Sequence, residues 1–173
     1  DSNLLTLGTA TVAGTLAGTP SDTNMVRGPF ARTIANANAN TNYILFPVGK
    51  TTYAPVWAAP ATTAVSVMKA ETFDTNTGTQ SAAISNMATN RRWELPLVSG
   101  TINDINVRVG DAGILATSIP VQAPSAAGEY TSTFGSVATA VAGVSTQSTT
   151  PVLNASYTGF LSYADSNACV GVP

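Results

Sequence analysis

The chain has 173 residues, a length that suits one domain, and a formal net charge of -2. Charged residues make up only 9% of it, against about 25% in an average soluble domain, so we expect a neutral surface rich in hydroxyl and amide groups. Its seven Lys plus Arg form no cluster, which argues against binding to nucleic acid or to anionic membrane surfaces. No apolar run reaches the roughly 18 residues of a membrane span.

The N-terminal stretch LLTLGTATVAGTLAGTP alternates Thr with aliphatic residues around a repeated Gly-Thr pair. This pattern is typical of an edge hairpin, an exchanged strand or the final turn of a β-solenoid. We therefore treat residues 1–24 as an N-terminal β-segment or junction. The main β-sandwich domain is predicted in residues 25–164, and residues 165–173 are predicted to form a tail or linker.

The following stretch, VRGPFARTIANANANTNYILFPVGK, places an Asn-Ala alternation between two strand candidates. If this run were extended, Asn36, Asn38 and Asn40 would present their amides on one face. Two interpretations remain open. The run is either a polar hairpin loop between core strands or a row of amides that contacts a neighbouring subunit, a sugar or ice, although ice binding would require a longer regular repeat.

Tyr53 and Trp57 lie four residues apart around Pro55, and this spacing puts both rings on the same face of an extended strand. Sugar-binding β-sandwiches use aromatic rings as stacking platforms, so this pair is a candidate ligand site. The alternative interpretation places Trp57 in the core or an interface and Tyr53 at a half-buried strand position.

Period-2 patterns dominate the middle of the chain. In TAVSVMK, Val65 and Val67 lie opposite Ser66, and INVRVG alternates in the same way. In RRWELPL the alternation places Arg92 and Glu94 on one face, where they are a possible structural ion pair. Pro96 should confine that strand to an edge or force a bulge.

Frequent turn signals and the absence of a convincing helix pattern predict an all-β fold. We expect an antiparallel β-sandwich, immunoglobulin-like or jelly-roll-like, with little or no helix. The predicted core consists of Phe30, Ile34, Tyr43, Leu45, Val65, Val67, Trp93, Leu95, Ile105, Val107 and Val109.

The sequence lacks the usual groups of an enzyme. It contains no histidine, which removes the commonest general base and transition-metal ligand, and it has no nucleophile elbow or phosphate-binding loop. We expect no catalytic residues and no cofactor. An enzyme that uses Glu94 or Asp104 is a third hypothesis, after the two given below.

Two further features are candidate ligand or pairing sites. The run DTNTGTQSAAIS fails the EF-hand pattern, because Thr79 stands at the sixth position and Ser85 at the twelfth. A non-standard calcium site at Asp74 and Asn76 remains the alternative to an ordinary turn. The single cysteine, Cys169, is either a free thiol or a thiol that pairs with another chain.

Several short motifs, VRGPFARTI, YILFPVGK, YAPV and SNMATNRRWEL, resemble a recurrent β-rich module of very large secreted bacterial surface proteins, including predicted cargo of the type IX secretion pathway. The resemblance covers roughly residues 4–163. It implies a surface-exposed, non-catalytic β-module and brings no catalytic residues with it. The matching positions are Gly28-Pro29, Arg32-Thr33, Phe46-Pro47-Val48-Gly49, Tyr53, Pro55-Val56 and Arg92-Trp93.

Together these observations predict an extracellular, cell-surface building block with a structural or adhesive role. We expect a homo-oligomer or polymer, in which terminal segments such as residues 1–16 or 151–163 add a strand to a neighbour's sheet. Low charge favours this, because edge strands normally use charge to prevent association. The alternative is a carbohydrate-binding module that uses Tyr53 and Trp57.

Overall fold

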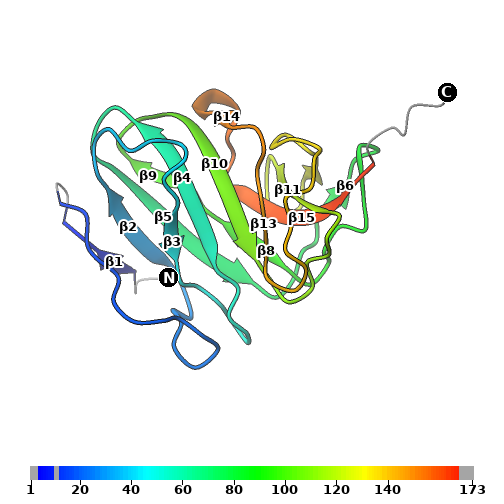
Figure 1. Ribbon diagram of the computed structural model, residues 1–173, viewed down its shortest axis with the longest axis horizontal. Coiled ribbons are helices and arrows are strands. Elements are labelled where there is room, and N and C mark those ends of the chain that lie inside the picture. Colours follow the sequence, from blue (N-terminus) through cyan, green and yellow to red (C-terminus); the bar gives the residue numbers. More distant parts are fainter. Residues whose placement is uncertain (1–3, 10–11, 168–173) are drawn as a thin grey trace.

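The computed structural model describes residues 4–9 and 12–167, and strands dominate these residues (Figure 1). The only helix among them is the short 3-10 turn η1 (Asn154–Ser156), so none is long enough to cross a membrane. The strands are β1 (Leu5–Leu7), β2 (Phe30–Ile34), β3 (Ile44–Phe46), β4 (Val56–Thr62), β5 (Ser66–Phe73), β6 (Thr79–Gln80), β7 (Ile84–Ser85), β8 (Arg92–Glu94), β9 (Leu97–Ser99), β10 (Ile102–Gly110), β11 (Ser118–Ala123), β12 (Glu129–Tyr130), β13 (Ser145–Gln147), β14 (Val152–Leu153) and β15 (Phe160–Ser166).

The strands form two principal sheets and a two-stranded ribbon. The larger, which we call the large sheet, has the order β1-β2-β5-β8-β15-β11, with β9 beside β5 and β7 beside β15. The second, the facing sheet, has the order β13-β10-β4-β3, with β14 beside β10. All pairs in the two sheets are antiparallel except β1 with β2, and the ribbon of β12 and β6 is parallel.

The two sheets pack face to face around one main apolar core, to which strands of both contribute. Its largest side chains include Trp93 and Met68 from the large sheet and Phe46 from the facing sheet. A smaller cluster of Ile119, Val121 and neighbours lies on the other face of the large sheet near β11. The architecture confirms the predicted all-β sandwich.

The N-terminal β-segment belongs to this architecture. Its strand β1 joins the end of the large sheet, and in Figure 1 it lies at the left edge of the molecule. At the other end, β15 runs to Ser166, slightly past the predicted domain boundary, and Cys169 lies outside the described residues.

Most of the predicted core is buried, namely Phe30, Ile34, Trp93, Leu95, Ile105, Val107 and Val109. The prediction was wrong for Val65 and Val67, which are only partly buried, because β5 has the opposite phase. Ser66 and Met68 face the core instead. The Ser66 hydroxyl is accommodated there because it donates to the Thr101 carbonyl oxygen at 3.2 Å.

The core prediction was also wrong for two residues in and next to β3. Tyr43 and Leu45 were predicted in the core, but both are only partly buried. Ile44 packs against the core and Phe46 is completely buried. The Tyr43 ring lies instead beneath the Arg108 guanidinium, whose central carbon is 4.7 Å from the ring centroid.

Pro96 separates β8 from β9 and does not confine β8 to an edge. Strand β8 is central, with β5 on one side and β15 on the other. The register of β5 is the same on both sides of Pro96, with Met68 opposite Leu97 and Glu71 opposite Glu94. The irregularity falls in β9, where Val98 is an extra residue between the pairs Val67–Ser99 and Met68–Leu97.

The phase of β5 can be tested with two neighbouring substitutions. Met68→Ala should lower the free energy of unfolding by about 2–5 kcal/mol, because it leaves a cavity in the main core. Val67→Ala should cost about 1 kcal/mol or less, because that side chain is partly exposed. Urea unfolding measures both, and equal losses would contradict the assigned phase.

Candidate functional site

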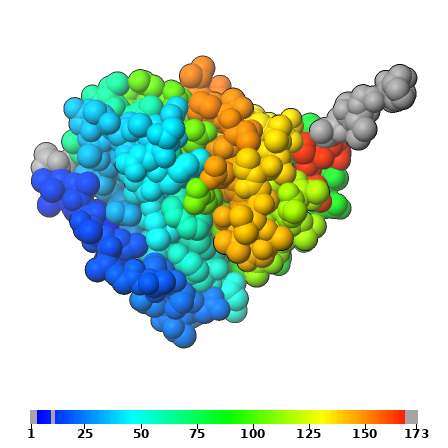
Figure 2. All heavy atoms as spheres, in the orientation of Figure 1, coloured from blue at the N-terminus to red at the C-terminus, as the bar shows by residue number. Residues whose placement is uncertain are grey.

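A surface cleft of about 550 Å³ lies where the N-terminal segment approaches the start of β4 and the end of β10. Figure 2 shows the N-terminal residues in blue along the lower left of the molecule, next to the cyan residues of the facing sheet. The cleft brings the two sequence-predicted aromatics together with two carboxylates. Its principal lining residues are Asp22, Tyr53, Pro55, Trp57, Gly110 and Asp111.

Tyr53 is positioned by its backbone. Its N–H donates to Asp22 Oδ1 at 2.6 Å, so the N-terminal segment is tied directly to the wall of the cleft. The side chain is half-buried, and burial raises the pKa of the Tyr53 hydroxyl above its ordinary value. This hydroxyl therefore stays protonated at neutral pH and can donate a hydrogen bond.

Trp57 lies on β4 and is partly buried. A Cβ added to Gly110 would come within 2.9 Å of Pro55 Cγ and 3.2 Å of the Trp57 ring, so only glycine lets these rings lie this close to β10. The Arg108 guanidinium carbon is 5.5 Å from the Trp57 ring centroid, within cation–π range. Gln147 holds Arg108 in place by accepting from Arg108 Nε at 3.0 Å.

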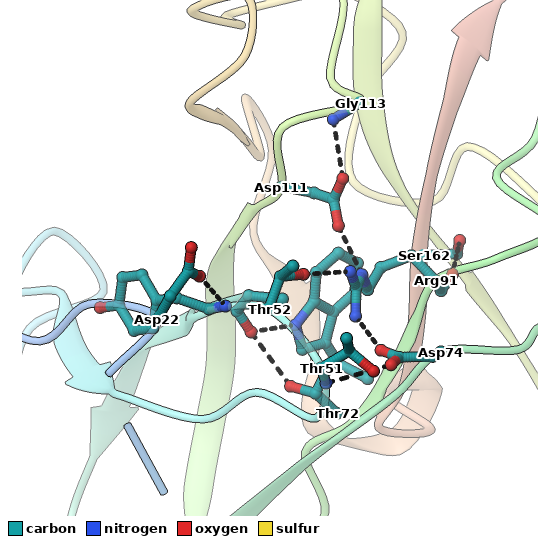
Figure 3. A network of polar contacts seen from close by, with 12 residues as sticks. Asp22, Thr51, Thr52, Thr72, Asp74, Arg91, Asp111, Gly113 and Ser162 are labelled. Carbon is teal, nitrogen blue, oxygen red and sulfur yellow. Dashed lines mark hydrogen bonds and ion pairs between the residues drawn. The ribbon is translucent and has the colours of Figure 1, made fainter. Parts of the chain in front are cut away.

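Between the two aromatics, Ala54 connects the cleft to the core. Its carbonyl oxygen accepts hydrogen bonds from Trp93 Nε1 at 2.8 Å and from the Thr72 hydroxyl at 3.0 Å (Figure 3). Both donors come from the large sheet. These two hydrogen bonds therefore hold the segment that carries Tyr53 and Trp57 against the large sheet.

Arg91 forms a buried charge cluster next to the cleft (Figure 3). Its guanidinium pairs with the carboxylates of Asp111 and Asp74, and it donates to the Thr52 hydroxyl at 2.9 Å. Asp111 also accepts from the Gly113 N–H at 2.7 Å. Arg91 thus compensates the charge of the cleft residue Asp111 only in part, because the same guanidinium also pairs with Asp74.

Opposing effects act on the pKa of Asp74. Burial raises its pKa, but hydrogen bonds from Thr51 and the charge and hydrogen bond of Arg91 lower it, and the net result is a pKa below the ordinary value. Both oxygens accept hydrogen bonds from protein groups. The positive charge beside Asp74 is supplied by Arg91.

Among the described residues, no cluster of calcium ligands forms at Asp74 and Asn76. Asn76 uses its amide to donate to the Ala88 carbonyl at 3.1 Å, and its Oδ1 accepts from the Gly78 N–H at 3.1 Å. Across residues 4–9 and 12–167, no group of three or more acidic, His or Cys side chains could hold a metal ion.

The Asn-rich run lies outside the cleft. It forms turns and is no hairpin, because it links β2 of the large sheet to β3 of the facing sheet. Asn38 donates to the Pro60 carbonyl at 2.8 Å, and Asn40 donates to the Asp104 carboxylate at 2.8 Å. Asn36 Oδ1 accepts from the next backbone N–H at 2.8 Å. These amides therefore stabilise a crossover between the sheets.

The two acids proposed for the enzyme hypothesis lie on different sheets. Glu94 on β8 is 3.2 Å from Arg92 Nη1, the geometry of an ion pair. Asp104 on β10 accepts from Asn40. The structure thus gives each acid a structural partner.

Asp22 and the Arg91 cluster were missed by sequence reasoning. Asp22 stands in an ordinary turn-like stretch, and Arg91 pairs with acids that are 17 and 20 residues away. Neither has a local pattern that would have revealed it.

Comparisons with known proteins do not assign the chain to a family. No protein-family model matches it, and no curated protein or solved structure matches it. The site is therefore interpreted from its own geometry.

The Arg91 cluster predicts a large difference in stability loss between a buried and an exposed arginine. Arg91→Met should destabilise the protein by about 3–5 kcal/mol, because it leaves the buried Asp111 carboxylate without its cation. Arg27→Met changes an exposed arginine, which donates to the Asp22 carbonyl oxygen at 3.2 Å, and should cost about 1 kcal/mol or less. Chemical denaturation at neutral pH measures both, and similar losses would contradict the structural role of Arg91.

Proposed function

We propose that the chain is a non-catalytic, extracellular structural or adhesive β-module that self-associates by strand addition at β1. The observation that carries this proposal is the position of β1 at the end of the large sheet, where no further described strand pairs with Leu5–Leu7. Just after β1 the chain turns back, and a single antiparallel bridge joins Gly8 to Ala13. Low surface charge and the resemblance to modules of secreted surface proteins support an extracellular role.

The composition of β1 favours association. An edge strand presents backbone N–H and C=O groups, and proteins normally protect it with charge, proline or a bulge. The sequence of β1, Leu-Thr-Leu, offers none of these. Leu4 and Leu5 are 45% and 55% exposed, and Val12 nearby along the chain is 61% exposed. A second strand would cover apolar surface as well as forming hydrogen bonds.

The segment 151–163 is less suited to exchange. Most of β15 falls within it, and β15 lies inside the large sheet between β8 and β11. Removing it would open the main core, since Leu161 and Tyr163 belong to it. Strand addition is therefore proposed at the N-terminal edge.

The partner strand determines the assembly. Pairing of β1 with β1 of a second copy is self-complementary and stops at a dimer. Pairing with a different edge, such as the terminal strand β3 or β13 of the facing sheet, continues into a filament. Light scattering and negative-stain electron microscopy distinguish these assemblies.

The test compares the wild-type chain with two lysine variants at increasing concentration. Leu5→Lys places a charge on the β1 edge and should raise the concentration needed for association by about tenfold or more. Val137→Lys adds the same charge at a residue that is 67% exposed and lies outside any strand, and should leave association unchanged. A wild-type monomer at every concentration, or equal effects of both variants, would contradict the proposal.

A further inference from the structure

The cleft between Tyr53 and Trp57 combines features that the proposed association at β1 does not use. It lies at the β4 and β10 end of the facing sheet, and β1 contributes nothing to its lining. We propose that this cleft binds a neutral pyranose unit of a glycan. This inference stands independently of self-association.

The apolar part of the cleft suits a sugar ring. Tyr53, Pro55 and Trp57 line it, and both aromatics are only partly buried. The C–H face of a pyranose is apolar and stacks on such rings, much as other apolar groups pack on aromatic faces. A cleft of about 550 Å³ with mostly apolar walls and a few polar groups has the general form of a small-ligand site.

The polar part of the cleft combines the Asp22 carboxylate, an acceptor, with the hydroxyls of Ser21 and Tyr53, which can donate or accept. Asp22 is exposed, and only its Oδ1 is engaged by the Tyr53 N–H. Among the described residues, no cationic side chain lies within ion-pair distance of the Asp22 carboxylate. A carboxylate in this state can accept hydrogen bonds from sugar hydroxyls.

The charge of the cleft favours neutral sugars over acidic ones. Arg91 is shared between Asp111 and Asp74, so that cluster keeps one negative charge, and Asp22 adds a second. The described residues that line the cleft include no Lys or Arg. Two arginines lie just outside the lining: Arg27 donates to the Asp22 carbonyl oxygen at 3.2 Å, and Arg108 lies over the Trp57 ring. Neither arginine forms an ion pair with the Asp22 carboxylate, so a uronate would bring a further carboxylate next to an uncompensated one, which is unfavourable. Neutral pyranoses avoid this repulsion.

The walls are organised before any ligand arrives. Ala54 is held by Trp93 and Thr72, and Gly110 allows Pro55 and Trp57 to approach the end of β10 closely. Little conformational entropy would then be lost on binding, which raises the affinity that a small contact area can give.

A proline-rich peptide is the competing occupant, because aromatic grooves also bind such peptides. Peptide recognition of that kind relies on donors that reach peptide carbonyl groups. The exposed charged group of this cleft is the Asp22 carboxylate, an acceptor, which suits hydroxyl donors better. The saccharide is therefore the favoured occupant, and the peptide is included in the test.

Tryptophan fluorescence gives a direct readout. The chain has two tryptophans, and Trp93 is 0% exposed, so quenching by acrylamide reports mainly on Trp57. Neutral β-glucan and mannan oligosaccharides should protect this emission from quenching. Oligogalacturonate, as the acidic probe, should not protect it.

Three variants localise the binding, with calorimetry as the second measurement. Tyr53→Ala, Trp57→Ala and Asp22→Asn should each weaken binding of the neutral oligosaccharide by about tenfold or more. Tyr43→Ala is the matched control, because Tyr43 also contacts Arg108 but does not line the cleft. It should leave the affinity unchanged. Asp22 is exposed, so its variant tests the site even if Trp57→Ala lowers stability.

Three results would overturn the assignment. The first is that no neutral oligosaccharide binds. The second is that binding is unaffected by Asp22→Asn and Tyr53→Ala. The third is that a proline-rich peptide binds in place of the sugars, with the same dependence on Tyr53 and Trp57.

Discussion

The carbonyl oxygen of Ala54 is where the two sheets and the cleft meet. It accepts one hydrogen bond from the buried indole of Trp93 and another from Thr72, so donors of the large sheet hold the segment that leads into β4. A buried carbonyl without such partners would destabilise the fold. Because Tyr53 precedes Ala54 and Trp57 follows it, the position of the aromatic pair depends on this contact. The shape of the cleft thus depends on the hydrogen bonds that Trp93 and Thr72 donate to Ala54.

Arg91 connects the same region through charge. Its guanidinium joins Asp74, which follows β5, to Asp111 at the end of β10, and its carbonyl oxygen accepts from Ser162 of β15. Removing these ions from water is costly, and the arrangement is favourable only because every partner is in place. Such a cluster specifies one alignment of the strand ends. Several of the few charged residues of the chain therefore pair with one another in this cluster. Few charges remain for the surface, which is largely neutral.

The sequence was sufficient for the all-β class and for β10, whose alternation of Ile105, Val107 and Val109 with polar residues has only one reasonable phase. It was insufficient for β5, because Val67 and Met68 are both apolar and the polar Ser66 is buried with a carbonyl partner. For the site, the spacing of Tyr53 and Trp57 placed both rings on one wall. Asp22 and the partners of Arg91 come from distant segments, and only the tertiary structure brings them together.

The chain carries few charges, an edge strand β1 that no further described strand covers, and an aromatic cleft, and the last two are its candidate surfaces for recognition. The central claim is that β1 accepts another strand, and hydrogen–deuterium exchange measured at low and high protein concentration tests it most directly. We predict that amide exchange in residues 4–9 slows at high concentration, while exchange in β5 and β10 stays constant. Unchanged exchange in residues 4–9 under conditions where light scattering shows association would contradict the claim and place the interface elsewhere.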